Sequence, residues 1–177
     1  MTIRNMIHQI TNLLKRRVLP ANIYARNIGV KMGKSCKISS TNFGTEPYLI
    51  ELGNNVHVTS GVTFITHEGG LWIFRHRIPN FDVFGKIKVG SNTYIGNNAT
   101  ILYGVEIGKN CIIGYGSVVT KSIPPNSVVA GFPAKVISTV SEFETKMLKS
   151  NMGTKLMNVH EKKSKLVGMP DTAFVKK

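Results

Sequence analysis

Apolar residues recur at a period of six in the second half of the chain. Six aliphatic side chains share this spacing: Val89, Ile95, Ile101, Ile107, Ile113 and Val119. Glycine follows four of them, and a small or modest side chain stands four residues after each of the first five. A period of six fits neither the 3.6-residue period of a helix nor the two-residue alternation of a lone strand. The pattern therefore predicts short strands joined by tight corners, with one aliphatic residue per hexapeptide facing inward.

Three such hexapeptides make one triangular coil, and stacked coils pair as parallel strands about 4.8 Å apart. The same register precedes this stretch at Leu52, Val58 and Phe64, and the 14-residue step from Ile38 to Leu52 requires a bulge at 42–48. A longer interruption, about residues 67–86, predicts an extruded loop. Insertions of this kind often build the binding face of a solenoid.

The two ends of the chain differ from this middle. Apolar residues at helical spacing between Ile3 and Leu14 predict a capping helix over residues 1–20. We expect the solenoid to occupy residues 21–137, closing in a strand or two over 127–137. Residues 138–177 are expected to form a short helix at 141–150 and then a lysine-rich, solvated tail without regular pattern.

The charge balance predicts anionic partners. Lys and Arg number 23 against 9 Asp and Glu, a formal net charge of +14, which favours nucleic acid, an acidic membrane surface or a phosphorylated ligand. No nucleic-acid-binding module accompanies the lysines, so we expect no nucleic acid. With no signal peptide or membrane span in the sequence, a cytoplasmic protein is expected. Cys36 and Cys111 occupy the small-residue position of the repeat and are interpreted as packing residues.

Two segments, 49–67 (LIELGNNVHVTSGVTFITH) and 87–137 (IKVGSNTYIGNN and the repeats after it), resemble the hexapeptide-repeat acetyltransferases. The resemblance implies an all-β fold, a left-handed parallel β-helix, assembled as a homotrimer with active sites between subunits. Residues 62–75 (VTFITHEGGLWIFR) are most similar to small O-acetyltransferases of bacterial capsule and O-antigen biosynthesis.

The family pattern places its catalytic histidine at His67, where the strand ends and the loop begins. A neutral imidazole there acts as general base near pH 7. The resemblance also implies an oxyanion-binding backbone N–H at Asn97. It implies acetyl-CoA as co-substrate, in a groove that follows the corners of successive coils. The corresponding cofactor-binding positions are Asn97, Tyr115, Thr120, Lys121 and Lys135. Tyr115 departs from the family, whose members often carry Ala at this position.

Three residues are candidates for acceptor binding. Glu46 faces either His67 or the acceptor hydroxyls, or else is an ordinary solvated carboxylate. Trp72 and the loop phenylalanines form either a sugar-stacking platform or the loop's own hydrophobic anchor. Arg75 holds an acidic group of the acceptor or pairs with Asp82. His57, His67 and His76 are too loosely spaced for a metal site, and we expect no metal.

The sequence thus predicts an acetyl-CoA-dependent O-acetyltransferase that acts on a sugar hydroxyl of a bacterial surface polysaccharide. The alternatives are a xenobiotic acetyltransferase, a small-sugar acetyltransferase of the galactoside or maltose type, a metal-dependent hydratase, and a non-catalytic scaffold. The N-terminal helix either caps the first coil or docks at the inner face of the cytoplasmic membrane, where a lipid-linked acceptor would lie.

Overall fold

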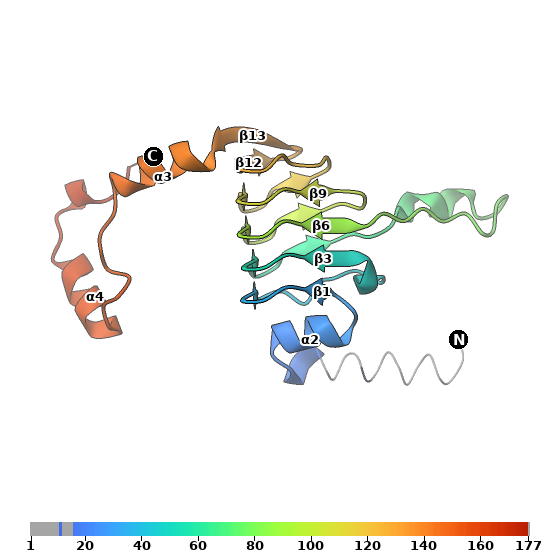
Figure 1. The fold of residues 1–177 in the computed structure, drawn as a ribbon, viewed down its shortest axis with the longest axis horizontal. Helices are drawn as coiled ribbons and strands as arrows, with labels where there is room; N and C mark the ends of the chain where they lie inside the picture. Colours follow the sequence, from blue (N-terminus) through green and yellow to red (C-terminus); the bar gives the residue numbers. More distant parts are fainter. Residues whose placement is uncertain (1–10, 12–15, 177) are drawn as a thin grey trace. The chain divides into compact units, whose positions relative to one another are not determined.

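The computed structural model describes residues 11 and 16–176, and its centre is a stack of coils built from three parallel sheets (Figure 1). The first sheet contains β1 (Lys31–Met32), β3 (Ile50–Leu52), β6 (Ile87–Val89) and β9 (Glu106–Ile107). The second contains β2 (Lys37–Ile38), β4 (His57–Val58), β7 (Tyr94–Ile95), β10 (Ile112–Ile113), β12 (Ser127–Gly131) and β13 (Ala134–Thr139). The third contains β5 (Thr63–Phe64), β8 (Thr100–Ile101) and β11 (Val118–Val119). Only the closing pair β12–β13 is antiparallel among these strands.

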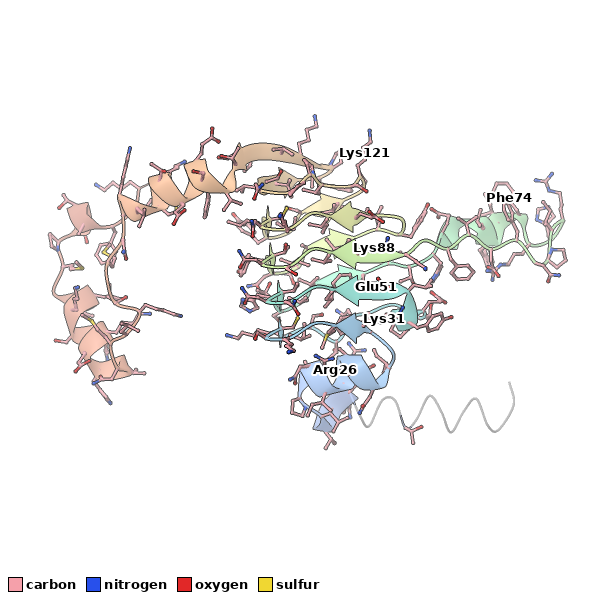
Figure 2. All side chains as sticks on the ribbon, in the orientation of Figure 1. Arg26, Lys31, Glu51, Phe74, Lys88 and Lys121 are labelled. Carbon is pink, nitrogen blue, oxygen red and sulfur yellow. The ribbon has the colours of Figure 1, made fainter. Side chains whose placement is uncertain are left out.

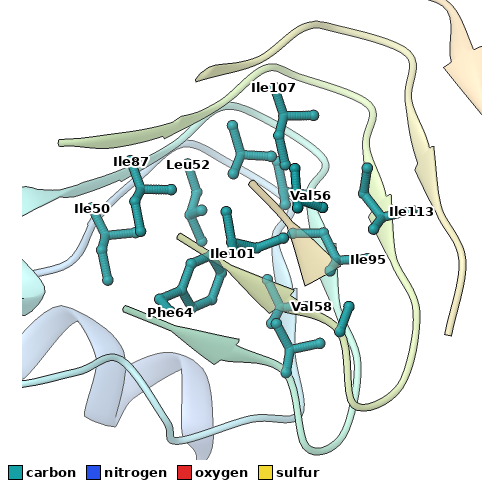
Figure 3. Packing of buried hydrophobic residues seen from close by; sticks show 14 of the residues in the cluster. Ile50, Leu52, Val56, Val58, Phe64, Ile87, Ile95, Ile101, Ile107 and Ile113 are labelled. Carbon is teal, nitrogen blue, oxygen red and sulfur yellow. The ribbon is translucent and has the colours of Figure 1, made fainter. Parts of the chain in front are cut away.

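The six-residue period becomes the core of this stack. Ile101 of β8 pairs in register with Phe64 of β5 and Val119 of β11, and all three are fully buried. Figure 3 shows Ile101 and Phe64 within this core. All six aliphatic residues of the period are 3% exposed or less. Each contributes about 1.5–3 kcal/mol to stability through burial. The predicted inward positions are therefore confirmed.

Outside the core, side chains repeat from coil to coil as well. Asn55, Asn92, Asn110 and Asn126 all adopt the left-handed backbone conformation, with φ between 53° and 62°. Their amides form a ladder with N–O distances of 2.7, 2.9 and 3.0 Å. Asparagine tolerates positive φ better than most residues, so one residue type serves both the turn and the contact between coils.

Charged side chains alternate on the outward positions of the first sheet. Lys31 pairs with Glu51 at 3.0 Å, and Lys88 pairs with Glu106 at 2.7 Å (Figure 2). Beside this ladder runs an open groove of about 640 Å³, and His67 is not among its lining residues.

A short helix, α2 (Ala21–Asn27), covers the N-terminal end of the coils (Figure 1). Its Tyr24 and Ala25 are buried, and its Arg26 donates to the carbonyls of Met32 and Gly33. Residues 21–27 were expected in the first coil, and this is wrong because a second helical segment begins directly after Pro20, while the described residues 16–18 before it are also helical. The apolar stripe of the helix expected over 1–20 lies outside the described residues.

Residues 141–177 form a separate compact unit. It contains most of α3 (Val140–Leu148), together with α4 (Val159–Val167) and the 3-10 turn η3 (Asp171–Ala173). The expected unpatterned tail is wrong here, because a capping box starts α4. Asn158 Oδ1 accepts from the backbone N–H of Glu161, and Glu161 Oε2 accepts from the backbone N–H of Asn158. The N-x-x-E spacing announces this start in the sequence. None of the helices described is long and apolar enough to cross a membrane.

Candidate active site

An arm leaves the solenoid between β5 and β6, where the six-residue period is interrupted (Figure 1). Its two strands meet at the root: His67 forms an antiparallel bridge with Phe84, and the Glu68 N–H donates to the Val83 carbonyl. The arm continues into the 3-10 helix η2 (Gly69–Phe74). His67 therefore lies where a regular wall gives way to the irregular arm.

The imidazole of His67 contacts a carboxylate from another loop. His67 Nδ1 lies 3.0 Å from Glu46 Oε2, and the Thr66 hydroxyl donates to the same oxygen at 2.6 Å. The Glu46 side chain is 16% exposed and that of His67 40%. The loop that carries Glu46 is anchored by Phe43, whose ring stacks on Phe64 at 5.5 Å. Core packing thus holds the carboxylate against the histidine.

Hydrogen bonding keeps Glu46 ionised. Burial raises its pKa, but hydrogen bonds from Thr66, Thr45 and His67 outweigh burial and hold the pKa below its ordinary 4.5. An anionic Glu46 accepts a hydrogen bond from a protonated Nδ1 of the neutral imidazole. In that tautomer Nε2 carries the free lone pair. The His67 side chain is 40% exposed, so the imidazole is open to a proton donor from outside. The pair has the arrangement of a general base with its orienting carboxylate.

Two further side chains, Glu68 and Tyr103, anchor the arm beside His67, and neither was among the predicted site residues. The Tyr103 hydroxyl donates to Glu68 Oε2 at 2.7 Å, and Glu68 Oε1 accepts from the Gly70 N–H at 2.8 Å. These bonds, the one from Tyr103 first, lower the pKa of Glu68. The repeat contained the clue: Tyr103 follows Ile101 by two residues, as Thr66 follows its register partner Phe64.

The predicted cofactor residues lie on two different corners of the coil. Asn97 and Tyr115 stack in the corner between the second and third sheets, where the Gly116 N–H donates to the Asn97 carbonyl. Thr120 and Lys121 follow β11, in the corner from which the arm leaves. A single subunit therefore groups His67 with Thr120 and Lys121, and separates it from Asn97.

Lys135 and Tyr115 both face solvent. Lys135 lies in β13 opposite Ala130, and Tyr115 is 80% exposed. An exposed Tyr115 leaves the backbone of its corner free of its own side chain. The exposed lysines suit a phosphorylated ligand, since each presents a hydrated positive charge.

The predicted acceptor residues of the arm make their contacts with other residues of the arm rather than with His67. Arg75 pairs with Asp82 at 2.7 Å, one of its two predicted alternatives. Phe74 packs on Phe81, and Trp72 is 73% exposed. The ring of Phe84 lies beside the predicted catalytic histidine, with its centroid 6.0 Å from that of His67.

The other two histidines have contacts of their own. His57 packs edge-on against Tyr94, and burial followed by the charge of Lys37 lowers the pKa of His57. His76 lies 2.9 Å from the Ile73 carbonyl through Nδ1. In residues 11 and 16–176, no three His, Cys, Asp or Glu side chains are grouped to hold a metal ion.

Comparison with known proteins places the chain in a family. Residues 86–121 match the model "Bacterial transferase hexapeptide (six repeats)". Protein CapG of Staphylococcus aureus is 47% identical over 154 residues, 85% of this chain and 88% of CapG. The crystal structure of a maltose O-acetyltransferase from Clostridium difficile 630 has a TM-score of 0.58 at 26% identity, covering 74% of this chain and 83% of that one. A galactoside acetyltransferase in complex with coenzyme A shares the fold, with a TM-score of 0.56 at 22% identity over 78% and 82% of the two chains. The protein therefore belongs to the bacterial hexapeptide-repeat transferase family and is an acyltransferase.

Proposed function

We propose that the protein transfers acetyl directly from acetyl-CoA to a sugar hydroxyl of a bacterial surface polysaccharide, capsule or O-antigen, or its precursor. The observation that carries the proposal is the 3.0 Å contact between His67 Nδ1 and Glu46 Oε2, which leaves Nε2 as the base. Likeness to a maltose O-acetyltransferase supports a sugar acceptor, and a galactoside acetyltransferase with coenzyme A supports the donor. We place the reaction in the cytoplasm, which supplies acetyl-CoA.

His67 accepts a proton from the acceptor hydroxyl and then donates it to the leaving sulfur. Nε2 takes the proton of the acceptor hydroxyl while that oxygen attacks the thioester carbonyl, and anionic Glu46 stabilises the imidazolium that forms. The C–S bond then breaks, and Nε2 returns the proton to the departing sulfur. The products are an acetyl ester and free CoA, so no covalent enzyme intermediate is required.

We further propose that the coil is left-handed and that three copies assemble with their active sites between subunits. The division of residues between two corners supports this: one subunit supplies His67 and Lys121, and its neighbour supplies Asn97 and Tyr115. In this arrangement the Asn97 N–H binds the oxyanion, and the phosphates of CoA meet Lys121 and Lys135.

For the acceptor, we propose that Phe84 and Trp72 offer apolar ring faces to the sugar. Phe84 is 50% exposed beside His67, and Trp72 lies further out on the same arm. Glu46, being bonded to Thr66 and His67, acts through the histidine. Arg75 is held by Asp82 and contributes to the acceptor site only by shaping the arm.

The test is release of free CoA from acetyl-CoA across a panel of nucleotide sugars and oligosaccharides. His67→Ala should lower kcat by at least about a hundredfold, since a positioned base contributes about 10²–10⁴. His57→Ala, a histidine on the opposite wall of the coil, is the matched control and should stay near wild type. Retention of kcat within about tenfold in His67→Ala would remove the proposed base.

Mixed assemblies test the shared site. His67→Ala loses the base, and Asn97→Trp fills the neighbouring corner with an indole, so each variant alone should be inactive. In a random mixture, about one interface in four joins an intact base to an intact corner, so about a quarter of wild-type activity should return. No recovery in assemblies shown to be mixed would place both corners' functions within one subunit.

A further inference from the structure

A hydrogen-bonded pair, Glu68 and Tyr103, joins the arm to the next coil. Glu68 is the first residue of the arm after His67, and it is tied in three ways. Its N–H donates to the Val83 carbonyl, its Oε1 accepts from Gly70, and its Oε2 accepts from Tyr103. Of these, only the Tyr103 bond connects the arm to a different coil.

The Tyr103 bond links the arm's first turn to a neighbouring coil. The arm's own contacts at Val83 and Gly70 would move with it, because both belong to residues 67–86. Tyr103 belongs instead to the next coil, in the corner turn just after β8, whose Ile101 is fully buried and paired on both sides. The Tyr103 phenol therefore ties the arm to the solenoid at Glu68, one residue after the proposed base His67.

We propose that Tyr103 is a positioning residue that acts through Glu68 to hold the arm and the imidazole of His67 in register with Glu46. The inference rests on the proposed acetyl transfer, but the contacts are independent of it. Because Tyr103 donates to an anionic carboxylate, the pKa of its hydroxyl is raised, and the phenol remains a donor at neutral pH.

The protein contains its own reporter for this role. Trp72 is the single tryptophan of the chain, and it lies in η2 with 73% of its surface exposed. Its fluorescence anisotropy reports the motion of the arm without any substrate. Loss of the Tyr103 bond should therefore be visible whether or not the acceptor has been identified.

The experiment compares Tyr103→Phe with Tyr94→Phe, which removes a phenol from another part of the coil wall. In Tyr103→Phe we expect lower Trp72 anisotropy, an unchanged KM for acetyl-CoA and a kcat about tenfold lower, since a misplacement of about 1 Å can cost up to about a hundredfold. The melting temperature should barely change, because the bond is partly exposed. Tyr94→Phe should match wild type in all four measurements.

The conservative variant separates positioning from charge. Glu68→Gln keeps a hydrogen bond to Tyr103, because the phenol can accept from the Gln amide N–H while the amide oxygen accepts from Gly70. It should therefore retain most of the wild-type kcat and anisotropy, whereas Glu68→Ala loses both bonds and should be at least as impaired as Tyr103→Phe. A Glu68→Gln variant as impaired as Glu68→Ala would overturn the proposal in favour of an electrostatic role for the carboxylate.

The two readouts also distinguish failures. A tenfold loss of kcat with unchanged Trp72 anisotropy overturns the positioning role, as does a mobile arm with unchanged kcat. If His67→Ala left acetyl transfer intact, the proposed function would fall, while the anisotropy change in Tyr103→Phe would still support the anchoring of the arm.

Discussion

In the solenoid wall, Ile95, Ile101 and Ile113 are fully buried and pair in parallel with their equivalents in neighbouring coils, whereas at the adjoining corner His67 is held by side chains that do not repeat. The wall draws its stability from the same apolar contact made many times. The corner depends on one carboxylate, Glu46, placed there by an irregular loop. Most of the stability and the proposed catalytic geometry therefore reside in different residues, and a substitution in one region should have its main effect there.

The largest effect on stability is expected from the wall. Ile101→Ala should lower the free energy of unfolding by about 2–5 kcal/mol, because the cavity cannot close between paired coils. Denaturant unfolding measures the loss, and kcat per folded molecule should be unchanged. Ile73→Ala, the same substitution at a 57% exposed site on the arm, is the control and should stay within about 0.5 kcal/mol. Equal losses of unfolding free energy in the two variants would contradict the view that the wall, and not the arm, supplies the stability.

The corner should show the opposite response. Glu46→Ala should lower kcat by about a hundredfold or more, because His67 loses the acceptor that selects its tautomer and stabilises its charged form. Steady-state CoA release measures this loss. Glu51→Ala removes a carboxylate from the exposed ladder of the wall and should leave kcat unaltered. Similar kcat values for the two variants would remove Glu46 from the site.

An intermediate effect is expected at the asparagine ladder. Asn92→Ala loses two side-chain amide bonds and places Ala at a φ of 59°, for a combined cost of about 2 kcal/mol. Asn92→Gly restores the backbone freedom and should cost only about 1 kcal/mol. Thermal melts of the two variants separate these contributions. Equal melting temperatures would show that backbone strain plays no part.

The smallest effect concerns acid stability. The pKa of Glu46 is lower in the folded chain than its ordinary 4.5. Ionised Glu46 therefore stabilises the fold above about pH 4.5, and this contribution is lost as the pH falls through the lowered pKa. Melting temperatures from about pH 3 to about pH 7 should fall more steeply on the acid side for wild type than for Glu46→Gln. Parallel curves would show that the carboxylate gains nothing from its partners.

Much of the fold could be predicted from the sequence because its determinant is local and repeated. Each hexapeptide repeats the same inward-facing position, so six aliphatic residues independently predict one register. Helices α2 and α4 were not predicted from the sequence, because each is marked by a single local start signal rather than by a repeated pattern. Pro20 suits a helix start as well as a helix end, and the capping box at Asn158 is one brief motif.

The sequence by itself determined the period, the inward residues and the place where the arm leaves at His67. Only the tertiary structure decided that Glu46, rather than another carboxylate, meets His67 at 3.0 Å, and that Tyr103 meets Glu68 at 2.7 Å. The reason is that contacts between coils depend on how much chain each coil loops out, and the bulge at 42–48 has no period. Likewise, only the three-sheet arrangement showed that Asn97 and His67 occupy different corners.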